Sequence, residues 1–183
     1  MSSNMLNDIS EILYSEQDLK EMVERVGAEI TRDYEGKNLL MVSVLKGSVA
    51  FMADLMRAVK IPAQIDFMSV SSYGAGVKTS GVVKIIKDLD LNLEGYDILI
   101  VEDILDSGKT LNYLMNLLSQ RNPSSIELCT LFDKPERREV PVYPKYVGTT
   151  IPDAIIVGYG LDYAENYRNL PFVGVLKPEV YGG

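Results

Sequence analysis

The chain has 183 residues, 46% of them hydrophobic, which is enough for one well-buried core and short for two, so we expect a single domain over residues 1–183. Its formal net charge of −8 argues against a nucleic-acid surface, which needs an excess of lysine and arginine. The absence of histidine excludes the commonest general base and every imidazole-dependent zinc site, so acid–base chemistry must fall to carboxylates, lysine or tyrosine.

Cysteine content and the N-terminal residues suggest a location for the protein. The single cysteine, Cys129, lies in an apolar, strand-like run, so we expect a buried structural thiol and no disulfide within the chain. Asp8 and Glu11 stand where a signal peptide would be basic and then apolar, and no apolar run approaches membrane-spanning length. We therefore expect a cytoplasmic protein that does not contact a membrane.

The predicted elements alternate between helices and strands. Ser15 and Asp18 form a capping-box pattern before apolar residues at helical spacing, which predicts an amphipathic helix that ends near Gly36. Helical patterns recur at residues 49–59 and after Lys109. Strands are expected at residues 39–45, 63–70, 83–87, 98–102, 126–132, 154–159 and 172–176. Apolar strands separated by helices predict an α/β fold with a mostly parallel central sheet flanked by helices.

Two segments interrupt this alternation. Residues 71–81, SSYGAGVKTSG, are rich in glycine and serine and have no apolar period, which predicts a mobile flap over about 71–82 or, alternatively, a plain hairpin loop. Residues 133–152 contain four prolines and cannot form a regular helix. We expect this stretch, with the terminal segments, to build a small cap over the strand ends.

Residues 98–111, ILIVEDILDSGKTL, are the most informative part of the chain. An apolar strand is followed by two adjacent carboxylates, Glu102 and Asp103, then by a loop of small residues and a helix. Such a loop offers backbone N–H groups, hydroxyls and a helix N-terminus, which together suit a phosphate. The carboxylates suit sugar hydroxyls or a hydrated divalent cation, so the expected ligand carries phosphate, sugar and metal.

This motif has two other possible interpretations, a nucleotide-triphosphate P-loop and an ordinary turn. Gly108-Lys109-Thr110 ends like a nucleotide-triphosphate P-loop, but the first glycine of that motif falls at Asp103, whose carboxylate would repel phosphates. An ordinary turn with solvated acids would explain one aspartate but not Glu102, Asp103 and Asp106 together. Both interpretations are therefore disfavoured.

The wording VEDILDSGKTL resembles the phosphoribosyl-pyrophosphate signature of the purine phosphoribosyltransferases, and most of all that of the hypoxanthine-guanine phosphoribosyltransferases. The resemblance implies a type I phosphoribosyltransferase-like fold with a small hood and a flexible active-site loop. It also implies that Glu102 and Asp103 face the ribose hydroxyls and Mg²⁺. The 5′-phosphate would be held by Asp106, Ser107, Gly108, Lys109 and Thr110.

Pyrophosphate residues are implied by three further matches to the same family. Lys46 and Gly47, in a turn between a strand and a helix, resemble the family's pyrophosphate loop. Ser72 and Tyr73 match the flap that closes over pyrophosphate, and Arg168 matches a pyrophosphate-binding arginine.

Base-binding residues are implied by the segments LFDKPERR and IPDAIIVGYGLDYAENYRNLP. Lys134 would donate to the oxygen of a 6-oxopurine, which disfavours adenine because lysine cannot accept a hydrogen bond. Ile155 and Ile156 would flank the base, and Asp162 would approach both purine and metal. Family members commonly have an aromatic residue where Ile155 stands, so this chain offers only dispersion and apolar contact for stacking.

The implied activity is Mg²⁺-dependent transfer of a phosphoribosyl group to hypoxanthine or guanine, with Asp106 as the candidate base and a homodimer or homotetramer as the assembly. A xanthine-directed enzyme and an RNA-binding regulator with the same fold are the alternatives, although the net charge disfavours the latter. The carboxyl ends of parallel strands bind the ligand in such sheets. We therefore expect the Lys46 turn, the 102–110 segment and Lys134 to meet at one sheet edge.

Overall fold

In a computed structural model, which describes residues 4–72 and 83–182, the chain forms two β-sheets and three α-helices. The α-helices are α1 (Glu16–Asp33), α2 (Val49–Ala58) and α3 (Lys109–Ser119), and short 3-10 turns are η1 (Met5–Asp8), η2 (Pro135–Arg137) and η3 (Pro178–Val180). The strands are β1 (Ile9–Tyr14), β2 (Leu39–Val44), β3 (Gln64–Ser72), β4 (Val83–Lys87), β5 (Asp97–Leu105), β6 (Ser125–Asp133), β7 (Tyr146–Thr150), β8 (Ile156–Val157) and β9 (Val173–Leu176).

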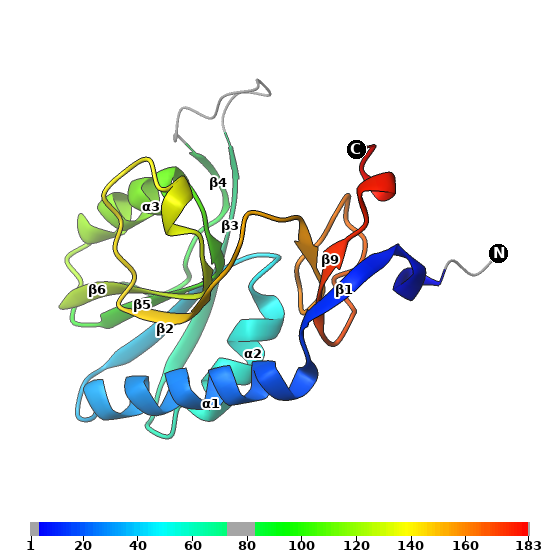
Figure 1. Ribbon diagram of the computed structural model, residues 1–183. Coiled ribbons are helices and arrows are strands. Elements are labelled where there is room, and N and C mark those ends of the chain that lie inside the picture. Colours follow the sequence, from blue (N-terminus) through cyan, green and yellow to red (C-terminus); the bar gives the residue numbers. More distant parts are fainter. Residues whose placement is uncertain (1–3, 73–82, 183) are drawn as a thin grey trace.

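The larger sheet has six strands in the order β4-β3-β2-β5-β6-β7. All neighbours in it pair in parallel except β3 and β4, which are antiparallel. Helices α1 and α2 cover one face and α3 covers the other (Figure 1). The prediction of an α/β fold with a mostly parallel, helix-flanked sheet is therefore confirmed.

Each face of the large sheet has its own apolar core. Val26 and Ile30 of α1 and Phe51 of α2 are completely buried in the core on one face. Leu114 and Leu118 of α3 are completely buried in the core on the other. Because the sheet is covered on both faces, its central strands are mostly apolar, and all six residues of β2 are buried.

The start of α1 follows the predicted capping box. The Ser15 hydroxyl accepts a hydrogen bond from the Asp18 amide at 3.1 Å, and the Asp18 carboxylate accepts one from the Ser15 amide at 2.9 Å. The helix ends at Asp33, and Gly36 follows with a φ of +78°, a conformation that favours glycine.

Strand β5 extends beyond its predicted end at residue 102. It continues to Leu105 because β6 also continues, with Ile104 opposite Phe132 and Leu105 opposite Asp133. Glu102 and Asp103 are therefore part of the strand, and the loop begins only at Asp106. The sheet thus fixes the backbone of both acids.

The second sheet was not predicted. Strand β9 pairs antiparallel with both β1 and β8 in the order β1-β9-β8. The strands expected at residues 154–159 and 172–176 therefore do not join the parallel sheet, and the first of them shortens to Ile156–Val157. Figure 1 shows this small sheet beside the large one, with the short turns η1 and η3 next to it.

The expectation that all of residues 133–152 form a cap is wrong, because Tyr146–Thr150 is an edge strand of the large sheet. This part of the stretch contains no proline, so it can pair with β6. Its backbone also accepts hydrogen bonds from Arg25 of α1, at 3.1 Å for the Val147 carbonyl and at closer range for the Gly148 carbonyl. The small sheet, which includes the two terminal segments, takes the place beside the strand ends that the cap was expected to fill.

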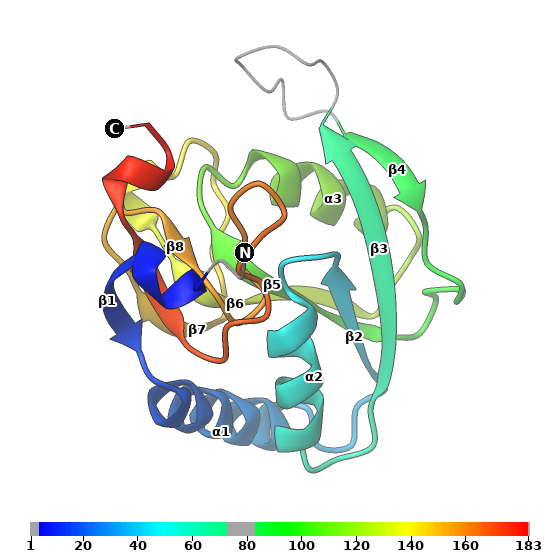
Figure 2. The same ribbon diagram turned by 90° about the vertical axis from the view of Figure 1, so that its right-hand side faces the viewer.

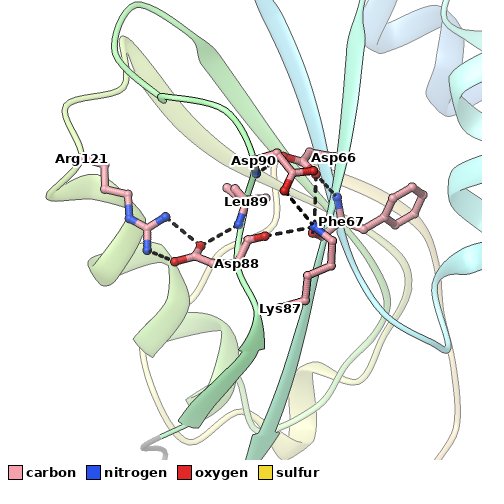
Figure 3. Close-up of polar contacts among 7 residues, drawn as sticks. All are labelled: Asp66, Phe67, Lys87, Asp88, Leu89, Asp90 and Arg121. Atoms are coloured by element: carbon pink, nitrogen blue, oxygen red, sulfur yellow. Dashed lines mark hydrogen bonds and ion pairs between the residues drawn. The ribbon is translucent and has the colours of Figure 1, made fainter.

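A polar network holds the antiparallel edge of the large sheet (Figure 3). The ammonium of Lys87 donates to the Phe67 carbonyl at 3.0 Å, and the buried carboxylate of Asp66 accepts from the Asp90 amide at 2.8 Å. Arg121 donates two hydrogen bonds, each 2.8 Å long, to the carboxylate of Asp88. The chain that leaves β4 is thereby tied to both β3 and the segment after α3.

The predicted flap lies largely outside the described residues. Strand β3 includes Ser71 and Ser72, and residues 73–82 are not described. Within residues 4–72 and 83–182, no helix has the length and apolar character that a membrane crossing requires.

Close packing of α1 on α2 depends on Gly27. A Cβ added there would lie 2.5 Å from the Ala58 Cβ and 2.8 Å from the Ala58 carbonyl oxygen. We expect Gly27→Ala to lower the free energy of unfolding by about 1–3 kcal/mol through overpacking, measured by urea denaturation. The control is Glu24→Ala on the exposed face of α1, and equal stability of both variants would contradict this prediction.

Candidate active site

Three adjacent parallel strands end at the same edge of the large sheet, and a loop rich in polar residues follows each one. The loops after β2, β5 and β6 contain Lys46-Gly47, Asp106-Ser107 and Lys134, respectively. The Lys134 amide donates to the Leu105 carbonyl at 3.0 Å, and the Gly47 backbone lies directly against the Asp103 carboxylate. The predicted meeting of these clusters at one edge is therefore confirmed.

The loop between β5 and α3 has the expected shape of a phosphate seat. Gly108 precedes α3 with a φ of +85°, and a Cβ there would lie 3.0 Å from the Arg138 side chain. The Ser107 carbonyl accepts from the Glu139 amide at 2.9 Å, and the Asp106 carbonyl accepts from Arg138 at 3.2 Å. These contacts use the loop carbonyls, and the Lys109 amide donates a long hydrogen bond of 3.4 Å to the Ser107 hydroxyl. An anion at the start of α3 could replace this weak contact and accept from the N–H groups of the first turn.

Two predicted phosphate residues follow this glycine. Lys109 and Thr110 form the first turn of α3. The Lys109 ammonium lies 3.0 Å from the Glu139 carboxylate, so it already has an acidic partner in this structure.

Glu102 and Asp103 form an adjacent acidic pair, in which Glu102 is buried and Asp103 is half-buried. Glu102 is only 8% exposed. Burial raises the pKa of its carboxyl group well above the usual range, and the negative charge of the neighbouring Asp103 raises it further. Burial also raises the pKa of Asp103, and the nearby Arg168 opposes that shift. The site therefore disfavours two negative charges here unless a cation or hydroxyl groups compensate them.

A metal would find two carboxylates here, but no protein cage. Among the described residues, no group of three or more acidic, cysteine or histidine side chains could hold a metal ion. The expected set of Glu102, Asp103 and Asp162 is therefore not gathered into one cluster. The adjacent pair still fits Mg²⁺, which is usually held by one or two carboxylates together with substrate oxygens and water.

Lys134 and Asp106 lie on the same side of the molecule and are joined by two residues that were not predicted. Arg137 lies 2.8 Å from the Asp106 carboxylate and 2.7 Å from that of Asp153, which is 3.7 Å from the Lys134 ammonium. The Lys134 side chain is 11% exposed. The hydrogen bond between Arg137 and Asp153 lowers the pKa of the Asp153 carboxyl group and raises the pKa of the Arg137 guanidinium.

The two isoleucines expected to flank a base differ in exposure. Ile155 is 37% exposed, whereas Ile156 is 5% exposed and packs into the core between the large sheet and α1 and α2. Ile155 therefore offers the larger accessible apolar surface.

The segment after β8 brings Arg168 and Asp162 to the Lys46 turn. Gly160, with a φ of +94°, packs so closely that a Cβ there would lie 2.5 Å from the Gly47 carbonyl oxygen. Figure 2 shows this orange segment next to the loop that leads into α2. Arg168 donates to the Gly160 carbonyl at 2.8 Å and lies 3.5 Å from the Asp162 carboxylate.

A third unpredicted residue, Glu165, lies between the two expected pyrophosphate cations. One carboxylate oxygen is 3.1 Å from the Lys46 ammonium and the other is 3.1 Å from the Arg168 guanidinium. Hydrogen bonds first from Lys46 and then from Arg168 lower the pKa of Glu165. The local sequence does not distinguish Glu165 from an ordinary surface acid. Arg168 is only three residues away, but Lys46, the partner that makes Glu165 a bridge, is 119 residues away in the chain.

The two flap residues expected at the pyrophosphate contribute no geometry to this site. Tyr73 lies outside the described residues, and Ser72 is described only as the last residue of β3. Their roles stay predictions.

Comparison with known proteins assigns the chain to a family. A model of the phosphoribosyl transferase domain matches residues 10–164. A hypoxanthine-guanine phosphoribosyltransferase of Streptococcus pyogenes serotype M3 is 56% identical over 174 residues, which are 95% of this chain and 97% of that protein. The chain belongs to the hypoxanthine-guanine phosphoribosyltransferase family.

A solved structure and a longer relative support this family assignment. A hypoxanthine phosphoribosyltransferase of Staphylococcus aureus has a TM-score of 0.96 and 50% identity, with all of both chains covered. The bifunctional protein TilS/HprT of Listeria monocytogenes is 52% identical over 180 residues, 98% of this chain, but this chain spans only 28% of its length. The fold is that of a type I phosphoribosyltransferase.

The buried acids of this phosphoribosyltransferase should make its stability depend on pH. Because folding raises the pKa of Glu102, the folded state keeps a proton that the unfolded chain releases above about pH 4.3. The contribution of Glu102 to the free energy of unfolding is therefore greatest below about pH 4.3, where the carboxyl group is protonated in both states. This contribution decreases as the pH rises through the pKa that Glu102 has in the folded state.

We expect Glu102→Gln, which cannot ionise, to melt about 2–4 °C above the wild type at pH 8, equivalent to about 1 kcal/mol. This difference should disappear near pH 4, as measured by differential scanning calorimetry without added metal or ligand. Glu127→Gln, on β6, serves as a control for the loss of one negative charge from the sheet. A melting difference that is constant with pH would contradict the assignment.

Proposed function

We propose that this protein transfers a 5-phosphoribosyl group from phosphoribosyl pyrophosphate to N9 of hypoxanthine or guanine, giving IMP or GMP and pyrophosphate in purine salvage, with Mg²⁺ as cofactor. The observation that carries this proposal is the convergence of a phosphate loop, an acidic pair and a buried lysine at one sheet edge. The names of the full-length relatives give independent support.

Phosphoribosyl pyrophosphate would bind across the loops after β2 and β5. Glu102 and Asp103 would accept hydrogen bonds from the ribose hydroxyls, and the α3 N-terminus would hold the 5′-phosphate. Lys46, Gly47 and Arg168 would face the pyrophosphate, with Ser72 and Tyr73 completing this end.

Glu102 and Asp103 would hold the Mg²⁺ together with substrate oxygens and water. When bound, Mg²⁺ supplies positive charge that offsets the negative charge developing on the leaving pyrophosphate. The fixed cations Lys46 and Arg168 act in the same direction, while the buried acids oppose the positive charge that develops on the ribose.

The purine would lie between Lys134 and the exposed Ile155, next to Asp162. The Lys134 ammonium donates only, so it favours an oxygen at purine position six over the amino group of adenine. Ion pairs through Asp153 and Arg137 connect Lys134 to Asp106 at this end of the site. Asp106 would accept the proton that the purine loses as its nitrogen attacks the ribose.

Assembly and location are proposed on family grounds. We propose a homodimer or homotetramer that works in the cytoplasm and binds these small molecules rather than nucleic acid or membranes.

Nucleotide synthesis from each of four purines, with phosphoribosyl pyrophosphate and Mg²⁺, tests this function. We expect product from hypoxanthine and guanine and none from adenine. Product from xanthine instead would favour a xanthine-directed enzyme, and no transfer to any base would contradict the proposal.

Asp106→Asn should lower turnover by a factor on the order of 10²–10⁴, because the amide cannot accept the proton. The affinity for phosphoribosyl pyrophosphate should change little, since the loop amides remain in place. Steady-state kinetics in both substrates would show this split, and an unimpaired turnover would remove Asp106 from the role of base.

Lys134→Met should raise the KM for hypoxanthine, with a loss in kcat/KM of roughly 10- to 100-fold from one charged hydrogen bond. The KM for phosphoribosyl pyrophosphate should be unchanged, because Lys134 lies at the base end of the site. Lys20→Met on the exposed face of α1 is the matched control. Equal losses for both substrates would indicate a general structural defect.

A further inference from the structure

Glu165 contacts both cations that the proposed function assigns to pyrophosphate. Each of its carboxylate oxygens lies 3.1 Å from a different partner, the Lys46 ammonium or the Arg168 guanidinium. A single carboxylate thus bridges two positive groups that lie 122 positions apart in the chain, at residues 46 and 168. The Glu165 carboxylate thus occupies a position between two cations where a larger anion could bind through charge-assisted hydrogen bonds.

The backbone at Glu165 is held in an unfavourable conformation. Ala164 and Glu165 have φ values of +51° and +67°, in the left-handed region that residues with a Cβ avoid. The Asp162 carboxylate accepts a hydrogen bond from the Glu165 amide at 2.9 Å, which fixes the turn. Such strain persists only where the surrounding structure imposes it, and it is frequent at ligand sites.

Two further features show that the seat is not complete with Glu165 alone. Within the described part of the chain, the buried Nε of Arg168 has no hydrogen-bond partner. The side chains of Lys46 and Glu165 are 68% and 63% exposed, so their ion pair is open to water and easily replaced. A ligand with more oxygens and more charge could displace the carboxylate from both cations.

Resting on the proposed function, we propose that Glu165 is a built-in counter-anion that keeps Lys46 and Arg168 together in the free enzyme and competes with pyrophosphate for them. Pyrophosphate must displace the carboxylate to bind, and the carboxylate returns as pyrophosphate leaves. Glu165 therefore acts as a positioning residue that weakens the binding of the product and so promotes its release. It does not contact the reacting atoms.

Isothermal titration calorimetry with inorganic pyrophosphate and Mg²⁺ on the full chain tests this role. We expect Glu165→Gln to bind pyrophosphate about three- to tenfold more tightly, the effect of losing two exposed ion pairs that the ligand must otherwise break. Glu165→Ala should shift the affinity for pyrophosphate in the same direction, because alanine has no polar side chain that could contact Lys46 or Arg168. The affinity for IMP, which lacks pyrophosphate, should be unchanged in both variants.

The matched control is Glu29→Gln, which also removes one exposed carboxylate at 3.1 Å from an arginine but on α1. It should leave the affinity for pyrophosphate at the wild-type value. Unchanged or weaker pyrophosphate binding by both Glu165 variants would overturn the competition, even if the wild type binds pyrophosphate normally. If the wild type itself fails to bind pyrophosphate, the assignment of the seat and the proposed function fall, and this inference falls with them.

Discussion

Parallel pairing of β5 with β6 up to the last residue of both strands is the constraint on which the site depends. It keeps the backbone of Glu102 and Asp103 inside the sheet, with Glu102 buried and Asp103 half-buried. It also brings the loop after β5 beside Lys134, whose amide bonds to Leu105. If β5 ended at residue 102, the acids would be solvated and the phosphate loop would have no fixed relation to the base end.

Local patterns were sufficient to predict the parts of the fold whose signals lie within a few residues. The Ser15–Asp18 capping box and the apolar run of β2 each determine one element through neighbouring residues. The polar loops were located by their position after apolar strands, and parallel topology then placed them at one edge. The roles of individual side chains were predicted from the family resemblance. Spacing alone places an acid near a loop but does not indicate which ligand it binds.

Elements that depend on distant partners could not be predicted in this way. Strand β1 shows no clean alternation and exists because β9, more than 150 residues later, pairs with it. Strand β7 was hidden by the prolines on either side of it. Arg137, Asp153 and Glu165 were missed for a similar reason, because each acquires its meaning only from charged groups on another loop.

The Asp162 carboxylate has consequences at both ends of the proposed site. It accepts a hydrogen bond from the Glu165 amide and lies 3.5 Å from the Arg168 guanidinium. Under the proposed function it would also lie beside the purine. In that case a purine or cation that drew this carboxylate away would loosen the turn that presents Glu165. Thermodynamic reciprocity would then require occupancy at the pyrophosphate end to alter affinity at the base end by the same factor. One short acidic side chain would thus couple the two ends of the site through a single turn.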